Sequence, residues 1–457
     1  MNTADHIWAR AGGPLLGALV YAVARAADLD GAACWAAAMT AWCILWWLTA
    51  AVPVAVTALL PMAVFPVVGV LDQRAVAESF GSPVVLLMLG GFLLSRAMEV
   101  SGAHRRIALL MVHLCGGGSS RRLVIGFMLA SAGLSMWISN TATALMLLPV
   151  ALAILERSRD PALAVPLMLG IAYAGSIGGI GTPIGTPPNL IFMQVYRDFT
   201  GTEISFLQWM AWALPVVALM LPLMALWLTR GLRGEGVELP ALEAWTSAQR
   251  RVLALFGLCA LAWITRTQPL GGWSAWLGTP GASDASVALL GAAALFLVSD
   301  GKGERLLDWE RALTIPWGIL LLFGGGICLA RGFMDSGLGA LIGAGLAGLD
   351  SLPLPLLVLL LCLAVTFMTE AVSNTAAATL LMPILAAVAV ALAVDPRLLM
   401  VPAAMSASAA FMLPIATPPN AIVYASGEIP PGRMAREGLV LNLLGAVVIT
   451  ACALLVL

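Results

Sequence analysis

A polar triplet occurs twice in this chain, each time at the start of an apolar stretch. Ser-Asn-Thr occupies residues 139–141 and again residues 373–375, and helix-forming apolar sequence follows both copies directly. Serine and asparagine are favoured N-cap residues. The N-terminus of a helix attracts anions through its free N–H groups and its dipole. The triplets therefore predict two helix ends that can bind an anion.

A second motif is also repeated. Gly-Thr-Pro-Pro-Asn spans residues 185–189, and Ala-Thr-Pro-Pro-Asn spans residues 416–420. Proline suits the first turn of a helix, because its missing N–H costs nothing there. Thr186 and Thr417 are therefore expected beside two further helix N-termini. The glycine- and proline-rich run 177–185 is typical of an unwound segment.

These motifs contain no arginine or lysine, so they describe an anion site without a fixed cation. A doubly charged anion in a low-dielectric cavity needs compensation. Hydroxyl, amide and carbonyl oxygens are ligands that a hard cation such as Na⁺ accepts. The pattern thus predicts anion binding that depends on Na⁺. The alternative is that the motifs only cap helices and satisfy broken backbone.

The composition identifies the setting of these motifs. Of 457 residues, 61% are hydrophobic and only 10% are charged, whereas a soluble domain has about 25% charged residues. We therefore predict an all-α polytopic protein of the inner (plasma) membrane, in contact with the lipid bilayer. No basic run indicates nucleic acid, the seven cysteines are isolated, and the three histidines lack metal-ligand spacing. We expect no cleaved signal peptide, because the N-terminal sequence lacks a charged n-region followed by a cleavage site.

The longest apolar stretches are too long for one crossing. As a single helix, residues 123–156 would be about 51 Å long, against a hydrocarbon core of about 30 Å. A break at the triplet gives a re-entrant helical hairpin with its tip inside the membrane, and residues 354–394 predict a second. The alternative is a pair of short helices joined at the surface. Residues 162–196 and 398–426 predict two broken helices.

The motifs belong to a longer internal repeat. Residues 87–102 parallel residues 322–337. This pair, the two triplets and the two Pro-Pro-Asn loops occur in the same order in both halves, at a nearly constant separation along the sequence. Three crossings in each half are compatible with inverted repeats. Residues 105–117 and 338–349 are too short to span and are expected at the membrane interface, and the positive-inside rule places the loop 230–251 in the cytoplasm. The predicted parts are N-terminal scaffold helices (1–81), a first repeat (82–230), a connecting loop with scaffold helices (231–309) and a second repeat (310–457).

At the paired triplets and the paired Pro-Pro-Asn loops, the sequence resembles the divalent anion–sodium symporter family. The resemblance covers nearly the whole chain. It implies a homodimer in which a transport domain moves like an elevator against a scaffold domain. It also implies sodium-coupled import of succinate, malate, fumarate, citrate or sulfate. The first loop has Thr186 where bacterial dicarboxylate members often have serine, which bears on substrate preference. Some members exchange anions without sodium.

The resemblance also implies ligand sets, carried over by motif. We name the two sodium sets the first cage and the second cage. The first cage would be Ser135, Ser139, Asn140 and the Gly185 carbonyl; the second would be Thr369, Asn374 and the carbonyls of Val372 and Ala416. The dicarboxylate would contact Asn140, Thr141, Thr186, Pro187, Ser373, Asn374, Thr375, Thr417 and Pro418.

Three further charged residues lie near the repeated motifs. Glu370 precedes the second triplet, and a hydrogen-bonded structural role near the cation is favoured over proton coupling. Arg96 and Arg331 occupy matched helix ends and are expected to snorkel or to pair with Glu99 and Asp335, not to bind substrate.

The predicted function is sodium-coupled import of a C4-dicarboxylate. Sodium-coupled citrate or sulfate uptake and sodium-independent exchange remain open. A membrane-embedded hydrolase is disfavoured, because the core motifs contain no histidine and only Glu370 lies beside a triplet. A channel is disfavoured because closed hairpin tips favour alternating access.

Overall fold

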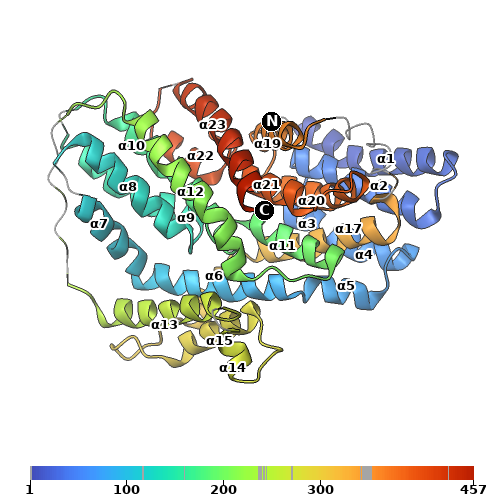
Figure 1. The fold of residues 1–457 in the computed structure, drawn as a ribbon, viewed down its shortest axis with the longest axis horizontal. Helices are drawn as coiled ribbons and strands as arrows, with labels where there is room; N and C mark the ends of the chain where they lie inside the picture. Colours follow the sequence, from blue (N-terminus) through green and yellow to red (C-terminus); the bar gives the residue numbers. More distant parts are fainter. Residues whose placement is uncertain are drawn as a thin grey trace.

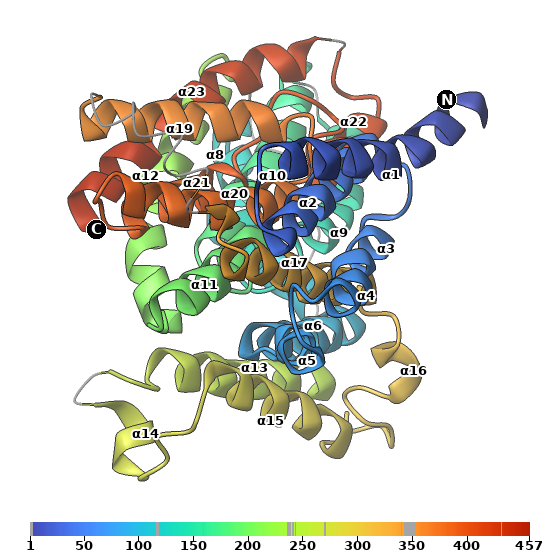
Figure 2. The ribbon, with the colours of Figure 1, turned by 90° about the vertical axis from the view of Figure 1, so that its right-hand side faces the viewer.

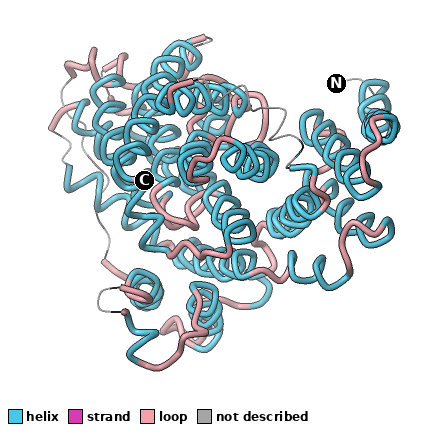
Figure 3. The backbone as a smooth tube through the Cα atoms, turned by 45° about the vertical axis from the view of Figure 1, so that its right-hand side comes forward, coloured by secondary structure: helices cyan, strands magenta, loops and turns pink. Residues whose placement is uncertain are grey.

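The structure is a computed structural model. It describes residues 3–115, 118–158, 160–234, 239, 242, 244–268, 271–339, 341, 352–430 and 432–457. These residues form α-helices joined by loops, with one isolated bridge between Ser299 and Arg305 (Figures 1 and 3). Seven of the described helices are long and apolar enough to cross a membrane. The predicted all-helical, polytopic fold is therefore confirmed.

The N-terminal helices pack on the first helix of the second half. Helix α17 contacts α2, α3, α4 and α5, while α1 packs on α2. The backbone of α17 lies very close to the chain at Ala58. A Cβ atom added to Gly325 of α17 would lie only 1.9 Å from the Ala58 carbonyl oxygen, so this position requires glycine. These helices are α1 (Thr3–Ala26), α2 (Gly31–Thr49), α3 (Val54–Thr57), α4 (Leu59–Val68), α5 (Gln73–Phe80) and α17 (Trp317–Asp335).

In the first half, the helix breaks fall at the predicted motifs. Residues 136–139 separate α8 from α9, and residues 181–186 separate α10 from α11. Glycine residues in the left-handed conformation end α6 and α11, at Gly102 and Gly201. The helices are α6 (Pro83–Ser101), α7 (Ala103–Cys115), α8 (Ser120–Ser135), α9 (Asn140–Leu155), α10 (Ala164–Ile180), α11 (Pro187–Thr200) and α12 (Phe206–Leu228).

The second half repeats this pattern. Residues 370–373 separate α19 from α20, and residues 407–417 separate α21 from α22. Most of the predicted interface segment 338–349 lies outside the described residues. The helices are α19 (Leu354–Thr369), α20 (Asn374–Ala391), α21 (Arg397–Ser406), α22 (Pro418–Ala425) and α23 (Arg433–Val456).

The helices between the halves form a layer of their own. Figure 2 shows α13, α14 and α15 at one edge of the molecule, with α5 and α6 on the side that faces the main bundle. Helix α15 packs on α6 and on α13. The connecting helices are α13 (Ser247–Ile264), α14 (Gly272–Trp276), α15 (Asp284–Leu297) and α16 (Trp309–Ala312).

The two halves interlock instead of lying side by side. Helix α22 packs on α9 and α10, α11 packs on α20 and α21, and α12 packs on α23. At the centre, the buried Tyr173 hydroxyl donates to the Met434 carbonyl oxygen at 3.3 Å. Its ring centroid is 5.0 Å from that of Phe411. This shared core holds the broken helices of both halves against each other.

Close packing of α8 on α10 gives a prediction for stability. A Cβ on Gly178 would lie 2.3 Å from the Ala132 carbonyl oxygen. We expect Gly178→Ala to destabilise the purified protein by about 1–3 kcal/mol, because backbone must shift to admit the methyl group. Thermal unfolding in detergent measures this. Gly257→Ala in α13 is the matched control, since nothing lies within 4 Å of its added Cβ; equal losses in both variants would contradict the packing argument.

Candidate functional site

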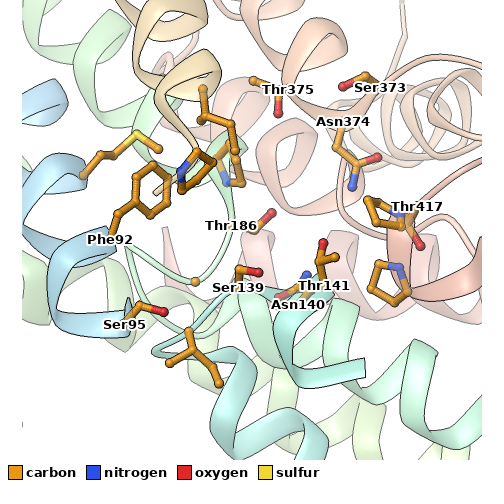
Figure 4. Close-up of a pocket in the computed structure, with 18 of the residues that line it drawn as sticks. Phe92, Ser95, Ser139, Asn140, Thr141, Thr186, Ser373, Asn374, Thr375 and Thr417 are labelled. Carbon is orange, nitrogen blue, oxygen red and sulfur yellow. The ribbon is translucent and has the colours of Figure 1, made fainter. Parts of the chain in front are cut away.

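The four predicted helix N-termini meet at one cavity of about 750 Å³. Helices α9, α11, α20 and α22 each begin at its wall. Figure 4 shows the two triplets around the space with Thr186 between them, while Phe92 and Ser95 approach from α6. The predicted residues in its wall are Ser139, Asn140, Thr141, Gly185, Thr186, Pro187, Val372, Ser373, Asn374, Thr375, Ala416, Thr417 and Pro418. The N–H groups and dipoles of four helices thus favour an anion there.

The capping residues differ between the copies. The Ser139 hydroxyl accepts from the Ala142 N–H at 3.1 Å, and the Thr417 hydroxyl accepts from the Asn420 N–H at 3.3 Å. Ser373 and Thr186 occupy the N-cap positions of α20 and α11, but within the described residues their side chains accept no capping bond. Ser373 therefore has the predicted N-cap position, but its side chain makes no capping hydrogen bond. The buried Thr186 hydroxyl instead contacts the Ser408 hydroxyl of the other half at 3.3 Å.

The structure places three residues of the first cage, Ser135, Asn140 and Gly185, beside α10. A Cβ on Gly179 would lie 2.9 Å from Asn140 Oδ1 and 3.2 Å from the Gly185 carbonyl oxygen. The Ser135 hydroxyl lies one turn away, beside Gly175. In the described part of the chain, Ser135 Oγ and Asn140 Oδ1 are buried without a hydrogen-bond partner. Buried polar oxygens of this kind fit a hard cation.

Hydrogen bonds join three residues of the second cage, Thr369, Val372 and Asn374. Thr369 Oγ1 lies 2.7 Å from Asn374 Oδ1 and 3.0 Å from the Ala407 carbonyl oxygen, and 3.4 Å from that of Val372. Thr369 and Ser135 do not line the cavity; both are fully buried behind it. The oxygen-only donor set again fits Na⁺.

The asparagine of each Pro-Pro-Asn loop has a structural role that the sequence did not assign to it individually. Asn189 Nδ2 donates to the carbonyl oxygens of Gly179, Ile180 and Thr182, at 3.0, 3.3 and 2.7 Å. Asn420 Nδ2 donates to those of Ala410 and Leu413, both at 3.1 Å. These amides satisfy the broken backbone and hold each unwound segment in place. The presence of this asparagine in both loops was the sequence signal that could have indicated its structural role.

The cavity wall also includes an arginine, although the prediction placed no fixed cation at the site, and an adjacent glutamate balances its charge. Arg96 and Glu99 both line it, and Arg96 Nη1 donates to Glu99 Oε2 at 2.9 Å. The local pair was predicted, but its place in the cavity wall was not. Arg331 pairs more closely with Glu78, at 3.1 Å, than with the predicted Asp335, at 3.9 Å.

Nearly the whole chain matches one family model. Residues 8–456 match the model described as the sodium:sulfate symporter transmembrane region. The chain belongs to the sodium:sulfate symporter family. It is therefore a multi-pass transporter of the plasma membrane and not an enzyme. The resemblance inferred from the repeated motifs is confirmed.

Curated relatives in this family have a more specific name. The sodium-dependent dicarboxylate transporter SdcS of Staphylococcus saprophyticus is 38% identical over 463 residues, covering 96% of this chain and 88% of the relative. The protein of the same name from Staphylococcus aureus gives the same identity and coverage.

Two solved structures share the fold of this family member. The YdaH transporter of Alcanivorax borkumensis has a TM-score of 0.58 at 17% identity, over 82% of this chain and 85% of that one. MtrF of Neisseria gonorrhoeae has a TM-score of 0.54 at 14% identity, over 83% and 82%. At these identities the likeness concerns the fold alone.

Proposed function

We propose that this transporter couples the import of a C4-dicarboxylate, such as succinate, malate or fumarate, to Na⁺ symport. The observation that carries the proposal is the convergence of four helix N-termini on one cavity, with buried side-chain oxygens of Ser135 and Asn140 near it in the first half and of Thr369 and Asn374 in the second. The relatives named sodium-dependent dicarboxylate transporter support the same substrate class.

Charge balance explains why sodium and substrate would bind together. A dicarboxylate carries two negative charges, which two sodium ions would neutralise beside the cavity. Asn140 and Asn374 each belong to a proposed cage and also line the cavity, so an ion in the cage would orient the amide that meets the substrate. The affinity for each ligand then depends on the other.

The proposed movement follows the repeat boundaries. The hairpins α8–α9 and α19–α20, with the broken helices α10–α11 and α21–α22, would move as a transport domain. Residues 1–81 and 231–309 would belong to the stationary scaffold of a homodimer. An inward sodium gradient would drive the loaded transport domain toward the cytoplasm.

Uptake of labelled succinate into proteoliposomes tests the proposal. We expect accumulation that requires an inward sodium gradient. Uptake only into succinate-loaded vesicles, without sodium dependence, would identify an exchanger and contradict the coupling. Sodium-dependent uptake of labelled sulfate with no uptake of succinate would keep the coupling and replace the substrate. Competition by malate, fumarate, citrate and sulfate then ranks the anions.

The substrate contact at Thr417 gives a second prediction. Thr417→Ala removes a hydroxyl from the cavity wall, so we expect the apparent succinate KM to rise by about five- to tenfold. The half-maximal sodium concentration should change by less than about twofold, because Thr417 is outside both proposed cages. Thr314→Ala is the matched control, since Thr314 also lines the cavity but its hydroxyl donates to the Arg311 carbonyl oxygen. An unchanged succinate KM in Thr417→Ala would contradict the contact.

A further inference from the structure

Glu370 receives an unusual number of hydrogen bonds for a buried carboxyl group. It is 5% exposed and directly follows the last residue of α19. Its Oε1 accepts from the N–H groups of Phe411 and Met412, at 2.8 and 2.9 Å, and its Oε2 accepts from that of Leu413 at 2.9 Å. The Asn442 amide donates a fourth bond to Oε1, at 2.8 Å. Four donors around one carboxyl group are the partners of a carboxylate, which only accepts.

The partners of Glu370 are neutral, which sets it apart from another buried glutamate in the same bundle. Glu437 pairs with Arg230 at 2.8 Å and with Arg433 at 2.9 Å. In the part of the chain that the structure describes, Glu370 forms hydrogen bonds but no ion pair. A buried negative charge without a paired cation is costly, so a cation binding nearby would relieve that cost.

The position of Glu370 connects this charge to the second cage. Its neighbour in sequence, Thr369, belongs to that cage and contacts the Ala407 carbonyl oxygen. The three backbone N–H groups that donate to Glu370 belong to residues 411–413. These residues lie within the unwound segment that runs from Ala407 to the cage residue Ala416. Asn442 Oδ1 also accepts from the Phe411 N–H, at 3.2 Å. The carboxylate thus fixes the backbone that carries the cage oxygens.

In the first half, no charged side chain stands at the position equivalent to Glu370. Met136 stands at the position equivalent to Glu370. There, the Thr182 hydroxyl donates to the Met136 carbonyl oxygen, and the Trp209 indole donates to that of Ile180 at 2.9 Å. Neutral groups therefore hold the end of α10 and the start of the first unwound segment. The two cages differ in their electrostatics although their motifs match.

We propose that Glu370 is a positioning residue of the second cage. It holds the unwound segment in the geometry that sodium requires, and its negative charge offsets the charge of the ion. This inference rests on the proposed sodium coupling. It attributes the electrostatic difference between the two cages to the Glu370 side chain.

Sodium-dependent thermal stabilisation of the purified protein tests this role without transport. Glu370→Gln removes the charge and replaces one acceptor oxygen by a donor. We expect the sodium concentration for half-maximal stabilisation to rise about tenfold, equivalent to about 1.4 kcal/mol. At saturating sodium, the succinate affinity should stay within about twofold of the unmodified protein. A general packing defect would not produce this split.

Glu437→Gln is the matched control, because it also removes a buried carboxylate from the bundle. Its sodium midpoint should remain unchanged. An unchanged midpoint in Glu370→Gln, or an equal shift in Glu437→Gln, would overturn the inference. If Glu370→Gln does not fold, Glu370→Asp keeps the charge and shortens its reach; a midpoint raised by at least about threefold supports positioning, and an unchanged one overturns it. Absence of sodium stabilisation in the unmodified protein would instead overturn the proposed sodium coupling.

Discussion

Asn140→Ala and Asn374→Ala are each expected to lower sodium-driven uptake by at least about 100-fold while the protein stays folded. Each side chain has two roles in the proposed mechanism. Its amide oxygen belongs to a sodium cage, and its exposed part lines the cavity. Truncation would therefore remove an ion ligand and a substrate contact in the same step.

The local geometry explains why the loss should be specific. Asn140 Oδ1 is buried and has no hydrogen-bond partner in the described residues, so its removal leaves no donor unsatisfied there. Asn374 Oδ1 lies 2.7 Å from Thr369 Oγ1, whose hydroxyl retains the Ala407 carbonyl oxygen as a partner. The folded state therefore loses little, while the ion-bound state loses a ligand. Initial uptake rates and sodium-dependent thermal stabilisation together measure this difference.

An aspartate at position 374 separates the role in sodium binding from the role in substrate binding. Asn374→Asp keeps an oxygen toward the cage, so sodium should still stabilise the purified protein. The added negative charge faces the cavity and should repel a dicarboxylate, so succinate should stabilise it far less. Wild-type sodium activation in either alanine variant would mean that the cages lie elsewhere.

The helix breaks and their convergence could be predicted from the sequence because local chemistry determines them. A helix begins directly after each Ser-Asn-Thr serine and each Thr-Pro-Pro-Asn threonine, and the recurrence of both motifs at a nearly constant separation relates the two halves. The breaks at residues 136–139 and 407–417 follow from these motifs. So does the meeting of both triplets at one cavity.

Contacts between distant segments could not be predicted in the same way. The pairing of Arg96 with Glu99 is a local feature of one helix, but its place in the cavity wall depends on how α6 packs against the rest. Glu370 reaches residues 411–413 across about 40 positions of sequence, a contact that only tertiary packing creates. The capping of α20 also departs from its motif, because Ser373 has the expected position without the expected bond.

Gly185→Ala is the second change with a large expected effect. A Cβ on Gly185 would lie 2.4 Å from the Gly179 carbonyl oxygen and 2.9 Å from that of Ser135. Both neighbours are backbone atoms, so the unwound segment must move to admit the methyl group. Because the Gly185 carbonyl belongs to the proposed first cage, we expect sodium-driven uptake to fall by at least about 30-fold.

The second half provides the matched control for this change. Ala416 stands at the equivalent position, so the second unwound segment already accommodates a methyl group there. Ala416→Gly should lower the stability by only about 0.5–1 kcal/mol through backbone entropy and leave uptake within about threefold. The half-maximal sodium concentration for thermal stabilisation, measured for both variants, distinguishes a distorted cage from general instability. If Gly185→Ala retains the wild-type sodium midpoint, the Gly185 carbonyl is not a sodium ligand and the first cage must be formed by other oxygens around α10.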